Sequence, residues 1–468
     1  MTHVDCEAAF RRFHPLYRKN RYIWERSRDA YAGGEAYIRQ ALIKHISEID
    51  LEYEERLRRA CYFNYPRKIA RLITQFVLSS DAVRTGADPA LVEDFSRDGM
   101  RTAEVMRQFS TMLNLYGSAA LWVEMPFFDG EIDLARKSAE RLRPAVRALS
   151  PLEVVDWGDG EDGLLNWVMI EENDLLDAGP FLPAVKVKRR KLWTRDHYYI
   201  LEQDAVTGRI AMPAAGRNPI GIVPIVFVSE ADGFRMGNGH YFEDVIRISD
   251  AILNNQSESQ MNLVKQMFGL LIISDSFARG ARRDPAENTT SATSRFSHVL
   301  ARSAAIWESP EERGISRYIS PSGTDTATIR EENQMLKREL YDLVGMAWAP
   351  DLRQAQTAES KSWDFHAVRQ FLASKVDLLE QAEVKAWQIM QKFDPLVPVP
   401  AVSYNRDFSI PDLQSSVESL LGLKELNSGP AFRKELAETA LTLLEKIRKI
   451  PAENRESIRQ EIRGGDHV

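Results

Sequence analysis

Residues 241–267 read YFEDVIRISDAILNNQSESQMNLVKQM and contain neither glycine nor proline. Apolar residues recur there at the three- and four-residue spacing of an amphipathic helix: Val245, Ile248, Ile252, Leu263 and Met267. A straight helix of this length is about 40 Å long. Its centre, Asn254–Gln260, is a run of seven polar residues, which a buried helix does not normally carry. We therefore expect a long helix with one wet side, packed against identical neighbours.

The residues directly after this helix are typical of short β-strands and loops. Residues 268–273 (FGLLII) indicate a strand. Residues 274–294 are rich in Arg, Asp, Asn, Thr and Ser and predict an exposed loop. Residues 297–307 and 314–319 are interpreted as short strands or turns.

Helices are expected again further on. The first begins at Thr324 or Asp325, either of which can cap it, and runs to about Val344. Gly345 and Pro350 then break the pattern. A long helix follows at 360–393, and 413–463 is helical with a break at Gly429-Pro430. The apolar stripe of the long helix comprises Phe365, Val368, Leu372, Val376, Leu379 and Trp387.

The chain before residue 125 also reads as helical. A helix is expected from Glu35 on, with Ile38, Leu42 and Ile46 at helical spacing. A second run, 52–78, contains Pro66, which should kink or split it. Its expected buried positions are Leu57, Cys61, Ile69, Leu72, Ile73 and Phe76. Pro89 opens a predicted helix to about Leu115 that ends near Gly117, and Ser118–Glu124 predicts a buried strand.

The region between residues 150 and 230 is rich in β-type runs. Five short strands are expected at 152–155, 165–171, 185–193, 198–202 and 209–212. The run KVKRRK (186–191) places Lys186, Lys188 and Arg190 on one strand face, and a solvated face is favoured over a binding patch. A further strand ends at Val228, and Pro224 within it suggests an edge position. The predicted class is α+β, mainly α.

Composition limits the function. The chain has 468 residues, with 61 basic against 68 acidic residues and a net charge of −7, which argues against a protein that coats DNA with a basic surface. Cys6 and Cys61 are the only cysteines, which excludes a disulfide framework and indicates a reducing compartment. No signal-peptide core and no apolar run long enough for a bilayer are seen. We expect a soluble intracellular or particle-associated protein.

Motifs for catalysis are not evident. Gly237-Asn-Gly239 lacks the third glycine of a dinucleotide-binding loop, and the eight histidines show no zinc-site spacing. The sequence DWGDGEDG (156–163) is rich in carboxylates, and a tight acidic turn between strands is favoured over a loose divalent-cation site. We predict no catalytic, cofactor-binding or metal-binding residue and a structural protein rather than an enzyme. The alternative is a metal-dependent nuclease that uses Asp156 to Asp162.

The order of elements between residues 218 and 393 is distinctive. A strand with Gly221-Ile-Val-Pro224-Ile is followed by the polar-centred helix, a small β-rich insertion, a second helix, a loop and a very long helix. This order resembles the portal proteins of tailed bacteriophages. Loose motifs at the flanks agree, namely YAGGEAYI (31–38), EERL (54–57) and NRDF (405–408). The resemblance covers about residues 20–450 and rests on element order.

The resemblance implies a protomer with named regions. It assigns a wing to 1–238, with its β-rich part at 151–230, and a crown to 400–468. Stem helices fall in 239–267 and 323–344, with a clip at 268–322, a tunnel loop at 345–359 and a long wing helix at 360–399. Another phage structural protein, such as an adaptor, is the alternative from this class.

The resemblance also implies partners. Twelve copies form a ring at one vertex of the capsid in the virion, assembled in the host cytoplasm, and double-stranded DNA passes through it. The terminase large subunit docks first and a head–tail adaptor protein later. Contacts with the major capsid and scaffolding proteins are implied, and neither a cofactor nor a membrane is.

Two sets of residues are candidates for these contacts. In the clip, Arg279, Arg282 and Arg283 could touch phosphates or a partner's acidic surface, and a solvated loop tip is an equal alternative. In the tunnel loop, Trp348, Arg353 and Gln354 could contact DNA, although packing on a neighbouring helix is favoured for Trp348. The two stem helices carry nine acidic and five basic residues, a mildly negative wall from which DNA is repelled rather than bound.

Overall fold

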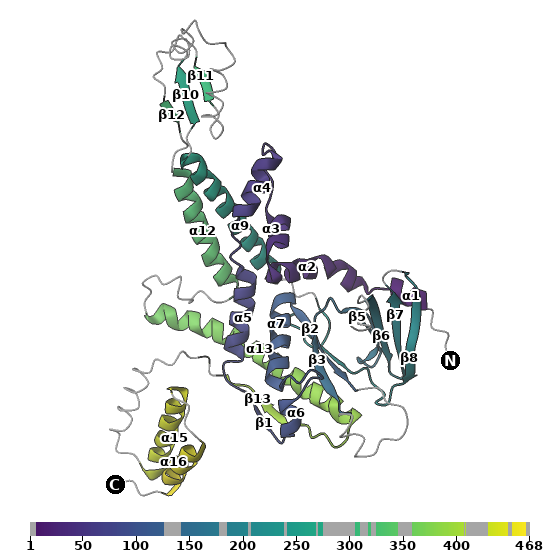
Figure 1. Cartoon of the computed structure of the whole chain (residues 1–468). Coiled ribbons are helices and arrows are strands. Elements are labelled where there is room, and N and C mark those ends of the chain that lie inside the picture. Colours follow the sequence, from purple (N-terminus) through teal and green to yellow (C-terminus); the bar gives the residue numbers. More distant parts are fainter. Residues whose placement is uncertain are drawn as a thin grey trace. The chain divides into compact units, whose positions relative to one another are not determined.

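A computed structural model provides the structure of the chain (Figure 1). It describes residues 6–125, 142–176, 185–204, 207–237, 241–267, 270–274, 305–308, 317–319, 324–344, 358–406, 408, 429–447 and 452–464. The chain divides into two compact units, residues 1–406 and 407–468, which are treated separately. Helices and strands are both abundant, which confirms the predicted α+β class.

Five helices open the first unit, and Pro66 splits the second predicted run as expected. The side chain of Asn64 caps the new helix by accepting from Arg67 N at 2.9 Å. The helix predicted from Glu35 through Ile46 is too long, because the chain turns extended at Leu42 and leaves Ile46 fully exposed. Cys61, predicted to be buried, is exposed between two helices. The helices are α1 (Cys6–Arg11), α2 (Pro15–Ala32), α3 (Glu35–Ala41), α4 (Asp50–Arg59) and α5 (Tyr65–Val77).

The single helix predicted from Pro89 to Leu115 is wrong. Two helices occupy this stretch, α6 (Pro89–Glu93) and α7 (Thr102–Tyr116). Between them the N–H groups of Phe95 and Ser96 both donate to the Met100 carbonyl, at 2.7 and 3.2 Å, which closes a tight turn. The second helix then starts afresh, with the Glu104 carboxylate accepting from Arg101 N at 3.0 Å.

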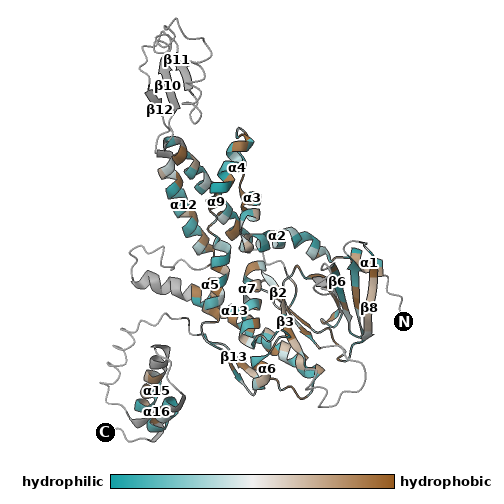
Figure 2. Ribbon diagram, in the orientation of Figure 1, coloured by the Kyte–Doolittle hydropathy of each residue, from teal (hydrophilic) through white to brown (hydrophobic). Residues whose placement is uncertain are grey.

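Gly117 joins α7 to the first sheet. Its φ of 71° is left-handed, so the chain reverses without a side-chain clash directly into β2 (Ser118–Glu124), as predicted. Two antiparallel neighbours flank β2, in the order β3 (Ala145–Leu149), β2, β9 (Ile225–Ser229). The edge position of the strand next to Pro224 is confirmed, whereas β3 was not predicted. Most residues of these strands are buried, and α7 and α13 (Ala358–Phe393) contact the sheet; Figure 2 shows brown segments on β2 and β3.

A second sheet is a five-stranded antiparallel meander, and all five of its strands were predicted. Its order follows the chain: β4 (Val154–Asp159), β5 (Leu165–Leu176), β6 (Val185–Thr194), β7 (His197–Asp204) and β8 (Ile210–Arg217). The solvated face predicted for β6 is wrong at Arg190. Its guanidinium is fully buried, pairs with Glu171 at 2.6 Å and lies over the rings of Phe10 and Phe13.

In chain order, one long helix precedes a small three-stranded sheet and a second long helix follows it. Helix α9 spans Tyr241–Met267 and α12 spans Thr324–Leu343, which confirms both predicted helices. The small sheet has the order β11 (Ala305–Glu308), β10 (Leu270–Ser274), β12 (Arg317–Ile319). Strand β10 runs parallel to β11 and antiparallel to β12.

The 36-residue helix α13 completes the first unit and confirms the long helix predicted there. Five of its predicted stripe residues are buried: Val368, Leu372, Val376, Leu379 and Trp387. The side chain of Phe365 lies outside the described residues. After α13, β13 (Ala401–Ser403) pairs antiparallel with β1 (Val83–Thr85).

The second unit contributes α15 (Pro430–Ile447) and α16 (Ala452–Gly464), which contact each other. In the portion of the chain with described coordinates, none of the helices combines the length and the hydrophobicity needed to cross a bilayer.

Candidate functional site

Helices α9 and α12 lie side by side as a pair of long helices (Figure 1). Apolar side chains on both helices are buried, among them Ile252 and Leu253 on α9 and Leu340 on α12. One polar contact joins the two helices: Asn255 Nδ2 donates to Asn333 Oδ1 at 3.2 Å. Because a buried amide needs its partner, this contact fixes how far one helix slides along the other.

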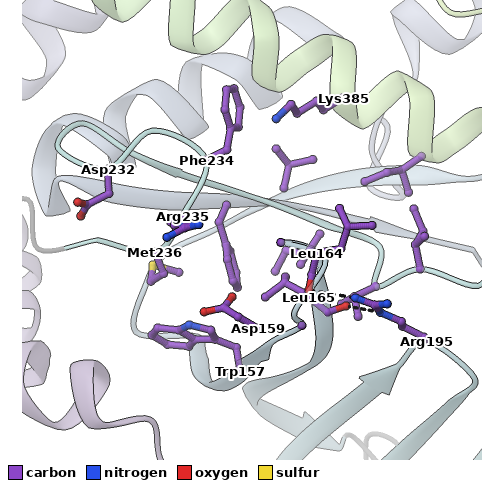
Figure 3. A pocket seen from close by; sticks show the side chains of 18 of the residues that line it. Trp157, Asp159, Leu164, Leu165, Arg195, Asp232, Phe234, Arg235, Met236 and Lys385 are labelled. Carbon is purple, nitrogen blue, oxygen red and sulfur yellow. Dashed lines mark hydrogen bonds between the residues drawn. The ribbon is translucent and has the colours of Figure 1, made fainter.

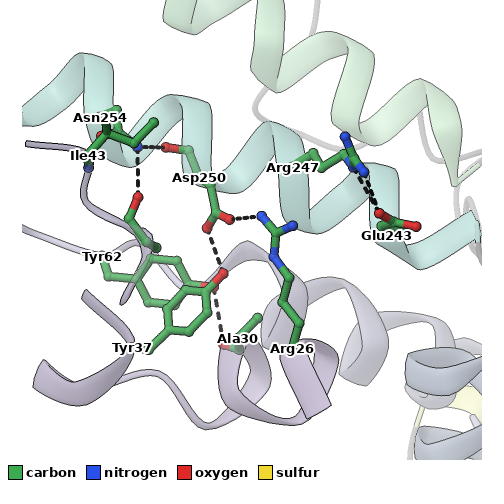
Figure 4. A network of polar contacts seen from close by, with 10 residues as sticks. Arg26, Ala30, Tyr37, Ile43, Tyr62, Glu243, Arg247, Asp250 and Asn254 are labelled. Atoms are coloured by element: carbon green, nitrogen blue, oxygen red, sulfur yellow. Dashed lines mark hydrogen bonds and ion pairs between the residues drawn. The ribbon is translucent and has the colours of Figure 1, made fainter. Parts of the chain in front are cut away.

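A polar network fixes the first half of α9 on the N-terminal helices (Figure 4). The Asp250 carboxylate accepts from the Tyr37 hydroxyl at 2.6 Å and from the Arg26 guanidinium at 2.6 Å. Burial raises the pKa of Asp250, while Tyr37 and Arg26 act in the opposite direction. The Tyr62 hydroxyl donates to the Ala30 carbonyl at 3.1 Å and its ring lies against Tyr37. This cluster, the Asp250 network, joins helices α2 and α3 and the connection between α4 and α5 to α9.

Asn254, four residues after Asp250, also attaches α9 to the N-terminal helices. Its amide donates to the Ala41 carbonyl at 3.1 Å and its oxygen accepts from Ile43 N at 2.9 Å, which caps the end of α3. Asn254 and Asn255 therefore bond within the chain. The prediction that the polar centre of α9 is simply a wet side needs revision, because Ser257 is buried, Glu258 is exposed and the other five residues of this run are half-buried.

Many exposed side chains of α12 are charged. Asn333 is buried, whereas Met335, two residues or about 200° further round the helix, is 53 % exposed. Charged residues with exposed side chains surround Met335: Arg330, Glu331, Glu332, Arg338, Glu339 and Asp342. Among the described residues, most positions around the circumference of α12 are thus exposed, as expected for a helix that faces solvent or another subunit.

A cavity of about 700 Å³ lies where the β4–β5 hairpin, β9 and α13 meet (Figure 3). Its wall includes the stacked rings of His14 and Trp157, 3.7 Å apart, and burial lowers the pKa of the His14 imidazole. Lys385 Nζ lies 3.2 Å from the centre of the Phe234 ring, and burial lowers the pKa of this ammonium. The wall is therefore mixed aromatic and basic. Sequence patterns gave no signal for it, because its residues come from distant segments.

The carboxylate-rich stretch 156–163 borders this cavity, and the predicted turn is only partly right, because residues 156–159 belong to strand β4 and only residues 160–163 lie in the turn between β4 and β5. Arg12 pairs with the buried Asp156 at 2.8 Å, and Arg195 holds Asp162 with two bonds of 2.6 and 2.7 Å. The hydrogen bonds from Arg195 keep the pKa of Asp162 at about 2. Among the residues with described positions, no three histidine, cysteine or carboxylate side chains converge as metal ligands would.

The residues predicted to contact DNA or partners are outside the described residues. This holds for Arg279, Arg282 and Arg283 in the loop after β10, and for Trp348, Arg353 and Gln354 before α13. Their roles stay predictions. The Asp250 network was missed, although a signal existed: Asp250 lies four residues after Ile246 and three before Leu253, on the apolar face of α9. A carboxylate at such a position indicates a buried partner.

Comparisons with known proteins found weak structural similarity only. No protein-family model matches the chain, and no curated protein sequence is significantly similar to it. A structure described as the virion of a native gene transfer agent particle is 14 % identical over 79 % of this chain and 89 % of that chain, with a TM-score of 0.43. Two neck structures of such particles, native with C12 symmetry and empty with C6 symmetry, have TM-scores of 0.40 and 0.41 at 13 % and 12 % identity, with the same coverage. Similarity at this level establishes neither family nor function.

Proposed function

We propose that this chain is the subunit of a portal ring, a closed homo-oligomer of twelve copies through which double-stranded DNA enters and leaves a phage-type capsid. The observation that carries the proposal is the sequence of parts from α9 to α13. Two long paired helices flank a small three-stranded sheet, and a 36-residue helix follows. A hairpin of helices with a sheet at its turn suits a ring, because each helix can contact its own partner and a neighbour.

The regions are assigned on this basis. Helices α9 and α12 form the stem around the channel, and the clip between them contains β10, β11 and β12. The tunnel loop precedes α13, the wing comprises the helices and sheets before α9 together with α13, and the crown lies beyond about residue 400. The excess of acidic over basic residues on α9 and α12 supports a channel wall that DNA slides along rather than binds.

The partners proposed for these regions follow from their chemistry. Three arginines in the clip, Arg279, Arg282 and Arg283, suit an acidic surface on the terminase motor and later on a head–tail adaptor. Arg353 in the tunnel loop suits the DNA backbone, beside Gln354 and Trp348. Wing and crown would meet the capsid and scaffolding proteins inside the virion. No chemistry is assigned to the chain.

The test uses particles assembled in the native host. Without this chain, capsids should contain no DNA, and the wild-type chain supplied in trans should restore packaging. Removal of residues 276–294 should leave ring assembly intact and abolish packaging. Arg353→Glu should slow packaging or weaken DNA retention without unfolding the ring. Normal DNA content in particles that lack the chain would contradict the proposed function, and normal packaging by the deletion would contradict only the clip assignment.

A further inference from the structure

The connection between α3 and α4 exposes an unusual number of large apolar side chains. Ile43, Ile46, Ile49 and Leu51 are 71, 101, 59 and 74 % exposed. We call residues 43–51 the apolar loop. Single exposed apolar residues are ordinary on a soluble protein, but four within nine residues form a patch that usually marks an interface.

This loop is held in place from within. The Asn254 side chain accepts from Ile43 N at 2.9 Å, and the Tyr53 hydroxyl donates to the Leu42 carbonyl at 3.0 Å. Arg56, which is buried, pairs with Glu48 at 3.1 Å and also donates to the Ile43 carbonyl. The loop therefore presents its apolar side chains outward in a fixed arrangement, which lowers the entropic cost of binding a partner.

A second exposed face lies on α12, on the side of α9 opposite to the apolar loop. Both α4 and α12 contact α9, and Figure 1 shows them on either side of it. The residues of α12 that point away from α9 form a line at helical spacing: Glu331, Met335, Arg338 and Asp342. We call this line the outer stripe of α12. Its apolar member, Met335, is 53 % exposed.

The apolar loop and the outer stripe of α12 lie at the same height along the axis of α9. Asn254 bonds to the apolar loop at Ile43, and the next residue, Asn255, bonds to Asn333 of α12, two residues before Met335. Rotation about a ring axis keeps the level of every atom along that axis. Two patches at one level and on opposite sides of a subunit can therefore meet in a head-to-tail contact that closes into a ring.

One acidic side chain beside the apolar loop and one basic side chain on the outer stripe have opposite charges, although the outer stripe as a whole has two acidic residues and one basic residue. Glu52 follows the apolar loop directly and is exposed, and Arg338 is exposed beside Met335. Neither side chain forms an ion pair within the part of the chain that the structure describes. A glutamate next to one apolar patch and an arginine next to the other would pair across the contact, where they also help to fix its register.

We propose that the apolar loop of one copy docks on the outer stripe of α12 of the next copy, with Ile46 against Met335 and Glu52 near Arg338. The inference rests on the proposed function, in which α9 and α12 run along the channel of a ring. The occupant of each face is a second copy of this chain, and the contact is heterologous, so every copy uses both faces.

Cysteine cross-linking tests the contact directly. Cys6 and Cys61 are first replaced by serine, and Ile46→Cys and Met335→Cys are introduced singly and together. Under oxidation the double variant should give a ladder of covalent oligomers on a denaturing gel. An equal mixture of the two single variants should give dimers and nothing larger. Absence of both products from an assembled ring would overturn the inference.

Assembly provides the second readout. Ile46→Asp should shift the native mass from the ring toward the 53.3 kDa monomer, with an unchanged far-UV spectrum because the Ile46 side chain is fully exposed in the structure. Tyr22→Asp is the matched control, since Tyr22 is 65 % exposed on α2 and away from both faces, and should leave the ring intact. A ring that survives Ile46→Asp contradicts this interface alone. A parent chain that forms no ring contradicts the proposed function itself.

Discussion

Arg190 illustrates how a single buried charge organises the start of the chain. Its guanidinium pairs with Glu171 on the adjacent strand and donates to the carbonyls of Ala9 and Arg12, which fixes the N-terminal segment on the five-stranded sheet. The alternation of side chains correctly placed Lys186, Lys188 and Arg190 on one strand face. Burial of that face at Arg190 could not be predicted, because the covering residues Phe10 and Phe13 are about 180 positions earlier.

Removal of this side chain should be costly. We expect Arg190→Ala to lower the free energy of unfolding by about 3–5 kcal/mol, because Glu171 and two carbonyls lose their buried partner. Lys188→Ala is a matched control: Lys188 pairs with the same Glu171 at 2.8 Å but is 38 % exposed, so its loss should cost about 0–1 kcal/mol. Urea unfolding followed by circular dichroism measures both. Equal effects of the two variants would contradict the role of Arg190.

The Asp250 network supports a second prediction at this scale. Asp250→Ala leaves the Tyr37 hydroxyl and the Arg26 guanidinium without their acceptor and should cost about 1–3 kcal/mol. Glu243→Ala removes an exposed pair with Arg247 from the same helix and should cost about 0.3–0.5 kcal/mol. Limited proteolysis at the α2–α3 junction should increase for the first variant only. Indistinguishable unfolding and proteolysis in the two variants would show that the network does not hold α9.

Helices could be predicted where the apolar spacing is regular and no glycine or proline interrupts it. Helices α9, α12 and α13 matched expectation within two residues, because each is a long periodic run without internal glycine or proline. The break between α6 and α7 was missed although Asp98-Gly99 is a turn signal, and Gly99, with a φ of 80°, lies in the turn that the main-chain bonds to Met100 close. Strand β3 was missed as well, because AVRAL is too short to show a period.

The pairing of α9 with α12 gives a prediction at the scale of elements. Asn255→Leu alone leaves the buried Asn333 amide without its partner and should cost about 1–3 kcal/mol, whereas Asn333→Leu alone leaves the half-buried Asn255 amide unpaired and should cost less. The double variant should cost less than the sum, because both polar groups are gone. A double-mutant cycle of unfolding free energies measures this coupling. Strictly additive costs would mean that the two amides do not interact.

At the scale of the whole molecule, the order of helices and strands could be predicted from the sequence, but the proposed contact between copies could not. The candidate DNA and docking residues could be named only through the resemblance in element order. The apolar loop could not be seen in the sequence, because Ile38, Leu42 and Ile46 fit a helical spacing and Ile46 was therefore placed in a helix. Its exposure follows from the end of α3 at Ala41, which Asn254, more than 200 residues later, stabilises.

The central claim is that this chain closes into a ring, and the native mass of the purified chain tests it most directly. Light scattering or native mass spectrometry should give about 640 kDa, the mass of twelve 53.3 kDa subunits in a closed cyclic assembly. A value one subunit higher also fits a ring of this type. A monomer or dimer at every concentration, in the presence of scaffolding and capsid proteins as well as alone, would contradict the claim.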